Sequence, residues 1–259
     1  MVPGTGIMTN SEGSSLSITS KQENEHIRKK NSDDGDPSVI TVLDGLERTW
    51  AMESANPDLS HEDPLDGLIL TILSQNTNDR NRDRAFESLK RDFPTWEQVL
   101  RSEPWELQDS IRVGGLSRVK AARIHRILNI LKEKFGEPTI QPLRSLQRKE
   151  IEDFLRTLPG IGAKTIACVL LFEFSIPVFP VDTHVSRVCQ RIGFVPEGTG
   201  EPSIQVVMEK LIHPSRYLGA HLNMISHGRN ICKARKPLCG QCTVRHCCRY
   251  FKFNSGKYL

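Results

Sequence analysis

The chain has 259 residues, of which 37% are hydrophobic and 6% aromatic, and its 35 Lys and Arg side chains against 31 Asp and Glu give a formal charge of +4. This length suits one large domain or two small ones. No stretch approaches the roughly 20 consecutive apolar residues of a membrane helix, and the first residues lack the basic start and apolar core of a secretory signal. We therefore expect neither a membrane protein nor a secreted one.

The N-terminal segment differs in composition from the rest of the chain. Residues 1–38 are rich in Ser, Gly, Asn and charged side chains, and they contain no aromatic residue and no periodic apolar pattern. Such a segment cannot bury enough apolar surface to offset the entropy lost on ordering. We expect residues 1–38 to be a disordered tail.

Beyond the tail, apolar residues recur at helical rather than alternating spacing. Asp63 followed by Pro64 is typical of a helix start, and a helix that begins at Ser117 should stop at Gly136 and Pro138. The pattern predicts an all-helical protein. Further helices are predicted at residues 79–92, 148–157, 163–174, 183–192, 202–212 and 215–231.

The cysteines and the basic residues both concentrate near the C-terminus. Five of the seven cysteines fall within seventeen positions, whereas a disulfide scaffold would spread them more widely. Residues 210–259 contain ten Lys or Arg and no acidic residue. The cysteine pattern favours a metal site, and the charge fits either a nucleic-acid partner or a solvated charged face.

A short turn between two predicted helices has the sequence Leu158-Pro-Gly-Ile-Gly-Ala-Lys-Thr165. Gly160 and Gly162 permit positive φ and the close approach of another backbone. Successive N–H groups at the start of the following helix form a concavity that binds anions. A DNA phosphate would fit there without any side chain.

This L-P-G-x-G-x-K-T turn resembles the helix-hairpin-helix of the endonuclease III family of DNA glycosylases. The later segment Pro180-Val-Asp-Thr-His-Val185 resembles the loop that ends in the family's catalytic aspartate, and Asp182 follows Lys164 by the eighteen residues of the family pattern. The resemblance implies that Lys164 is the nucleophile and that Asp182 helps to activate it. Singly, Lys164 could be a surface lysine near a phosphate and Asp182 a plain helix cap, but the pair at this interval favours catalysis.

The cysteine spacing also matches this family. Four thiolates suit zinc or an iron–sulfur cluster, and the resemblance implies a 4Fe-4S cluster on Cys232, Cys239, Cys242 and Cys248. Cys247 could be a spare thiol or the true ligand in place of its neighbour. Three basic residues between the first two cysteines are expected to meet DNA phosphates: Lys233, Arg235 and Lys236.

Two further segments resemble DNA-contacting parts of the family. Leu116 stands at the wedge leucine of the G-L-x-x-x-K-A turn, although it could be an ordinary helix-start residue. Asn76 stands where the family has a glutamine that fills the space of the flipped base, and Gln75 precedes it. Either residue could therefore insert. His184 is expected to be a structural or phosphate-side residue rather than a base.

Together these resemblances imply two lobes, namely a six-helix barrel at residues 66–176 and a cluster lobe made of residues 39–65 and 177–250, with residues 251–259 as a C-terminal tail. They imply a monomer that binds double-stranded DNA with damaged bases or abasic sites, located in the cytoplasm, or in the nucleus or mitochondrion of a eukaryote. The implied activity is removal of oxidised pyrimidines and cleavage of the strand at the abasic site.

Two alternatives stay open at this point. One is a mismatch glycosylase that removes thymine, uracil or adenine, although adenine-removing relatives carry a glutamate at the position of Thr71. The other is a DNA-binding protein without catalytic activity that keeps the hairpin and the cluster.

Overall fold

The computed structural model describes residues 38–51, 60–254 and 256, so the predicted N-terminal tail lies outside the described residues apart from Ser38. The described part is all-helical, as predicted, and contains no strand. None of its helices is long and apolar enough to cross a membrane. The α-helices are α2 (Val39–Trp50), α3 (Pro64–Ser74), α4 (Asp79–Asp92), α5 (Trp96–Arg101), α6 (Pro104–Ser110), α7 (Ser117–Phe135), α8 (Arg148–Thr157), α9 (Ala163–Glu173), α10 (Thr183–Ile192), α11 (Glu201–Leu211), α12 (Tyr217–Asn230) and α13 (Arg249–Asn254).

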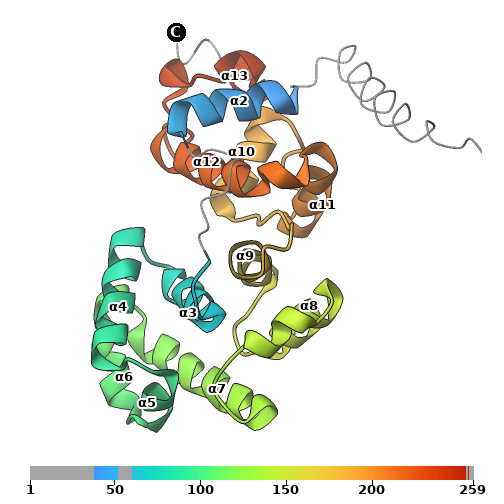
Figure 1. Cartoon of the computed structure of the whole chain (residues 1–259). Coiled ribbons are helices and arrows are strands. Elements are labelled where there is room, and N and C mark those ends of the chain that lie inside the picture. The colour runs from blue at the N-terminus through green and yellow to red at the C-terminus, as the bar shows by residue number, and fades with distance from the viewer. Residues whose placement is uncertain (1–37, 52–59, 255, 257–259) are drawn as a thin grey trace, which may run out of the picture.

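The helices form two lobes with separate hydrophobic cores (Figure 1). The core of the lower lobe draws its buried residues from Leu65 to Val178, on α3 to α9 and the turns between them. The core of the upper lobe combines apolar residues of α2 with residues between Phe179 and Cys248. The described part of the chain therefore begins in the upper lobe, forms the lower lobe and then returns to the upper one.

Local capping explains several helix ends. Asp63 caps α3 by accepting the N–H of Leu65 at 2.9 Å, with Pro64 at the first helical position, as predicted. The left-handed Gly136, with φ of 83°, ends α7 where the sequence predicted a stop. These residues fix where two core helices of the lower lobe begin and end.

Short helices α5 and α6 were not predicted. Thr95 and Gln98 form a reciprocal capping box at the start of α5, with hydrogen bonds of 2.9 and 3.3 Å. Pro104 at the first position of α6 is a second start signal. Both helices are too short for an apolar stripe to repeat, so the periodic pattern does not reveal them.

A buried lysine joins three segments of the lower lobe. Lys120 on α7 is 2% exposed, and its Nζ donates to the carbonyl of Leu73 at 2.7 Å and to that of Gly114 at 2.9 Å. Burial lowers the pKa of Lys120. The ammonium thus satisfies carbonyls at the end of α3 and in the turn before α7 that would otherwise lack donors.

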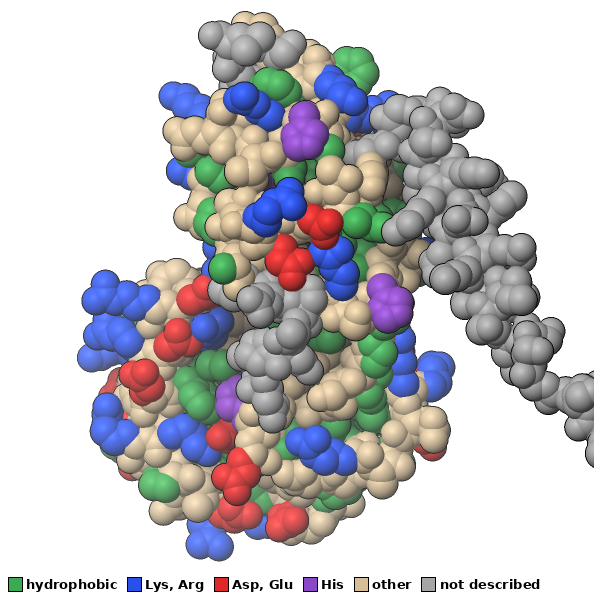
Figure 2. All heavy atoms as spheres, turned by 45° about the horizontal axis from the view of Figure 1, so that its top comes forward, with side chains coloured by type: hydrophobic (Ala, Val, Ile, Leu, Met, Phe, Trp, Pro, Cys, Tyr) green, Lys and Arg blue, Asp and Glu red, His purple; other side chains and the backbone are tan. Residues whose placement is uncertain are grey.

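Charge is mixed over the surface. Figure 2 shows acidic side chains beside basic ones on both lobes of the face in view. In the upper lobe, Arg216 lies 2.7 Å from Asp44 and 2.6 Å from Glu47, so α2 supplies acidic partners to the basic C-terminal region. Part of the C-terminal basic charge is therefore balanced within the protein.

Candidate active site

A cleft of about 860 Å³ is lined by residues of α3, α4, α9, α10 and α12, and so by both lobes. Lys164 is the second residue of α9, and Asp182 is the residue that caps α10. Both line this cleft. The fold therefore brings together, from different lobes, the two residues that the sequence singled out as a pair.

Asp182 is held by backbone donors. Its Oδ1 accepts the N–H of His184 at 2.9 Å and that of Val185 at 2.8 Å. No other hydrogen bond to its carboxylate is formed within the described part of the chain, which leaves Oδ2 available at the cleft.

Lys164 lies half-buried at the N-terminal end of a helix that is otherwise mostly buried. One turn further along α9, Cys168 is 4% exposed and lines the same cleft. Burial raises the pKa of the Cys168 thiol, and the positive charge of Lys164 opposes this shift only in part. The thiol stays protonated beside the amine.

His221 on α12 also lies at the cleft, and the sequence analysis did not single it out. It is 2% exposed, with its Nδ1 3.0 Å from the carbonyl oxygen of Pro180. Burial lowers the pKa of His221 to about 4, while the charge of Asp182 opposes the shift and that of Lys164 adds to it. His221 is therefore neutral near pH 7, and its Nδ1 donates to Pro180.

An ion pair crosses the cleft from one lobe to the other. Arg229 on α12 donates from Nη1 and Nη2 to the carboxylate of Asp79 at the start of α4, with the Nη2 bond at 3.3 Å. Burial alone would raise the pKa of Asp79, but the hydrogen bond and charge of Arg229, with Arg82 and Lys164, hold it below its usual value. The charge of Lys164 thus reaches Asp79 within the cleft.

The hairpin turn uses its two glycines differently. Gly160 has φ of 73°, and a Cβ there would lie 2.2 Å from Nε of Arg123. Gly162 has φ of −98° and caps α9 without a side-chain hydrogen bond, and a Cβ there would meet nothing within 4 Å. Of the two glycines that permit positive φ, Gly160 adopts it and Gly162 does not. The first turn of α9 keeps free N–H groups that face no capping side chain.

Four of the five clustered cysteines line one small cavity. Cys232, Cys239, Cys242 and Cys248 surround it together with apolar, aromatic and basic side chains, whereas Cys247 does not line it. In the described part of the chain, no three His, Cys, Asp or Glu side chains are grouped so as to hold a metal ion. Assignment of these cysteines to a cluster therefore depends on their spacing, their shared cavity and the family to which the chain belongs.

Arg191 on α10, another residue that the sequence did not indicate, fixes the loop after the first cysteine. Its guanidinium donates to the carbonyls of Lys233 at 2.7 Å and Ala234 at 3.0 Å, and it lies 3.5 Å from Sγ of Cys232. Its charge also lies over the ring of Tyr250. The loop therefore exposes its three predicted basic side chains: Lys233, Arg235 and Lys236.

His184 takes part in a contact between α10 and α12. Its Nδ1 lies 3.1 Å from Nη2 of Arg187, and the same Nη2 donates to the carbonyl of Gly228 at 2.8 Å. A Cβ at Gly228 would lie 2.8 Å from Cβ of His184. One ring nitrogen of His184 is thus occupied within the protein.

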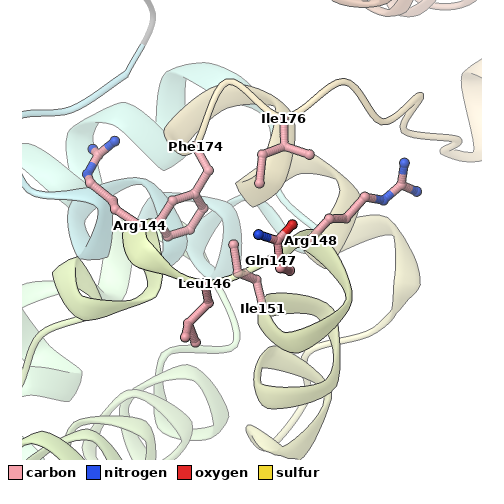
Figure 3. Close-up of a pocket in the computed structure, with 7 residues that line it drawn as sticks. All are labelled: Arg144, Leu146, Gln147, Arg148, Ile151, Phe174 and Ile176. Carbon is pink, nitrogen blue, oxygen red and sulfur yellow. The ribbon is translucent and has the colours of Figure 1, made fainter.

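A second hollow lies away from these groups, between the start of α8 and the end of α9 (Figure 3). The ring of Phe174 lies 5.5 Å from the Arg144 guanidinium, and Ile151 and Ile176 complete an apolar wall. Its lining contains no nucleophile and no carboxylate. The cleft that holds Lys164 is therefore the better candidate for chemistry.

Comparison with known proteins identifies the family. A family model described as HhH-GPD superfamily base excision DNA repair protein matches residues 69–214. Endonuclease III of Thermotoga maritima is 35% identical over 190 residues, which cover 73% of this chain and 84% of that protein. The chain belongs to the endonuclease III family of base excision DNA repair glycosylases. The resemblance noted in the sequence is thereby confirmed.

Other endonuclease III relatives agree in sequence and fold. The chain resembles the structure of a trapped covalent intermediate of endonuclease III and DNA with a TM-score of 0.71 and 29% identity, over 84% of this chain and 97% of the other. A protein of Arabidopsis thaliana described as a DNA glycosylase is 36% identical over 69% of this chain. The match spans 61% of that longer protein.

Three positions that the endonuclease III resemblance singled out now have a structural setting. Leu116 is 56% exposed and has φ of 50°. Asn76 has φ of 53° and lines the cleft. Gln75 instead accepts a hydrogen bond from Arg123 and donates to the carbonyl of Gly160 at 3.4 Å. Asn76, not Gln75, therefore faces the cleft.

Proposed function

We propose that this protein removes oxidised pyrimidines from DNA with Lys164 as nucleophile and then cleaves the strand at the abasic site. The observation that carries this proposal is the cleft that Lys164 and Asp182 both line from two lobes, in a chain of the endonuclease III family. In the reaction, the neutral amine of Lys164 attacks C1′ of the sugar and the damaged base leaves. The resulting Schiff base allows β-elimination of the 3′ phosphate, and water then releases Lys164.

The surroundings of Lys164 support each step. Asp182 accepts two backbone N–H groups on one oxygen, and its other oxygen can stabilise positive charge that develops on the sugar. Attack on the sugar requires the neutral amine of Lys164, so the ammonium must first give up its proton. Asp182 is then the group placed to receive that proton or to hold a water that does.

We also propose that the hairpin and its neighbours hold the DNA. The free N–H groups at Gly162 and the open space beside it suit a phosphate that approaches the backbone closely. Leu116, an exposed apolar side chain directly before α7, suits a wedge between bases. Asn76 is the residue placed to fill the gap left by the flipped base.

The cysteines fit a 4Fe-4S cluster by their number, their thiol chemistry and their common cavity. Cys232, Cys239, Cys242 and Cys248 would hold it, and the rest of their cavity is formed by apolar side chains together with Arg191, His227 and Arg245. When bound, the cluster would act as a structural clip rather than a redox catalyst. It would fix the shape of the loop that Arg191 already holds and that exposes Lys233 to DNA.

The proposal is tested by borohydride trapping on a duplex that contains thymine glycol. Wild type should form a covalent protein–DNA adduct and Lys164→Gln should form none. Lys210→Gln, which alters an exposed lysine on α11, should trap as wild type does. Absence of an adduct with wild type, in protein whose melting profile shows that it is folded, would favour a mismatch glycosylase or a DNA-binding protein without catalysis.

A further inference from the structure

A histidine and a buried glutamate lie in the wall of the cleft, apart from the groups described so far. Glu173, the last residue of α9, is 3% exposed, and its carboxylate accepts the backbone N–H of His61 at 3.0 Å. The two carboxylate oxygens also lie 3.1 and 3.2 Å from Nδ1 of His61. Both residues line the cleft. Because an ionised carboxylate only accepts hydrogen bonds, Nδ1 carries a proton.

The fold makes room for this carboxylate at one position on α3. A Cβ at Gly67 would lie 2.0 Å from Oε1 of Glu173, so a larger residue there would displace the pair. A buried carboxylate is costly unless it is paired. The hydrogen bond with Glu173 raises the pKa of His61, against the effect of burial, and the charge of Asp66 also raises it while that of Lys90 lowers it. The pairing therefore favours the imidazolium.

The second ring nitrogen of His61 is available. The His61 side chain is 29% exposed, and within the described residues its Nε2 makes no hydrogen bond, while the ring of Phe86 meets the imidazole edge to face at 6.2 Å. In the imidazolium, Nε2 also carries a proton and can only donate. The pairing with Glu173 thus favours a donor at Nε2, on a ring that is fixed through Nδ1 and belongs to a residue that lines the cleft.

The position of the pair suits the base rather than the sugar. Glu173 follows Lys164 by nine residues on one helix, which corresponds to about 13 Å along the axis. Because both ends of this helix and His61 line one cleft, a flipped nucleotide whose C1′ meets the amine can extend its base toward His61. Leu70, Thr71 and Phe172 also line the cleft and can enclose the ring of the base.

We propose that His61, positioned by Glu173, donates a hydrogen bond from Nε2 to a carbonyl oxygen of the flipped base. The pocket then selects pyrimidines that carry a carbonyl where cytosine carries an amine, namely derivatives of uracil and thymine. If the base carried an exocyclic amine in place of this carbonyl, as cytosine does, the amine and Nε2 would both be donors and could not form a hydrogen bond. The imidazolium would then be left unpaired. This inference rests on the proposed function, and it names the substrate class of that site.

The test compares two substrates that differ at this one group, 5-hydroxyuracil and 5-hydroxycytosine, in otherwise identical duplexes. Single-turnover excision is measured with the full chain as wild type, His61→Asn, His61→Gln and the control His213→Gln on the exposed turn before α12. The amide nitrogen of Asn can replace Nδ1 and keep the bond to Glu173, but it supplies no donor at the place of Nε2. The amide of Gln can replace Nε2.

We expect wild type to excise 5-hydroxyuracil at least about tenfold faster than 5-hydroxycytosine, as one hydrogen bond to a charged donor allows. His61→Asn should reduce this preference to less than about threefold, His61→Gln should keep most of it, and His213→Gln should keep all of it. Loss of the preference in Glu173→Gln would further support a positioning role for Glu173.

An unchanged preference in His61→Asn, or a wild type that prefers 5-hydroxycytosine, would overturn the inference. Equal loss in the Asn and Gln variants together with lowered melting temperatures would also overturn it, because the pair would then only stabilise the fold. Borohydride trapping on an abasic duplex, which has no base to recognise, separates these outcomes from failure of the proposed function. If wild type does not trap there, the proposed nucleophile is wrong, whatever the base preference.

Discussion

Replacement of Lys120 by Met should destabilise the lower lobe, because two buried carbonyls would lose their donor. The Lys120 ammonium is the group that donates to the carbonyls of Leu73 and Gly114, at 2.7 and 2.9 Å. A buried carbonyl left without a donor costs about 1–3 kcal/mol. The variant loses the donor to two such carbonyls, but it also no longer has to bury a charge, which offsets part of that cost. The expected net decrease in the free energy of unfolding is about 2–4 kcal/mol.

Thermal unfolding followed by circular dichroism at pH 7 measures this effect. For a chain of this size each kcal/mol shifts the melting temperature by about 2–4 °C, so Lys120→Met should melt roughly 5–15 °C below wild type. Lys132→Met, which changes an exposed lysine on the same helix, should alter the free energy of unfolding by about 0.5 kcal/mol or less. If Lys120→Met melts with wild type, the ammonium is not what stabilises the junction.

Three further predictions follow from the geometry around the cleft. Gly160→Ala places a side chain at a position with φ of 73° and should lower the free energy of unfolding in urea by at least about 1 kcal/mol. Gly162→Ala has open space at its Cβ and should change that free energy by about 0.5 kcal/mol or less. Equal losses in the two variants would contradict the backbone strain assigned to Gly160. Folding lowers the pKa of His221 from 6.5 to about 4, so the unfolded chain binds an extra proton between these pH values. The free energy of unfolding should therefore fall by up to about 3 kcal/mol as the pH drops from 6.5 to 4. In His221→Gln the free energy of unfolding should depend less on pH over this range. A double-mutant cycle of Asp79→Asn and Arg229→Gln should give a coupling energy of at most about 1 kcal/mol, because both side chains are close to half exposed. This coupling should weaken in high salt. A larger coupling that salt does not change would refute this account.

Sequence patterns predicted best where a helix is long and carries a periodic apolar stripe. The predicted bounds of α4, α8 and α10 agree with the structure, because their start and stop signals lie at the ends of clear patterns. The short helix α5 was missed although Thr95 and Gln98 formed a readable capping box. A reciprocal capping pair thus marks a helix start even where the helix is too short to show a periodic apolar stripe.

The candidate site was predictable only in part. A local motif indicated Lys164 and Asp182, and the family resemblance supplied the interval between them. His221, Arg191 and the His61–Glu173 pair enter through contacts between segments that lie far apart in the chain, which no spacing rule reports. Their environment, burial in particular, is set by tertiary packing and not by neighbours in sequence.

The path of the chain through the two cores has a consequence for its synthesis. The apolar face of α2, with Val42, Leu43 and Leu46, belongs to a core whose other residues begin at Phe179. At ribosomal rates of about 5–20 residues per second, the C-terminal residues of this core are synthesised roughly 10 s or more after α2. The intervening lower lobe can fold during that time. A nascent or truncated chain would therefore present an exposed amphipathic helix to chaperones and to other chains, and loss of the C-terminal segment would leave that helix without a core.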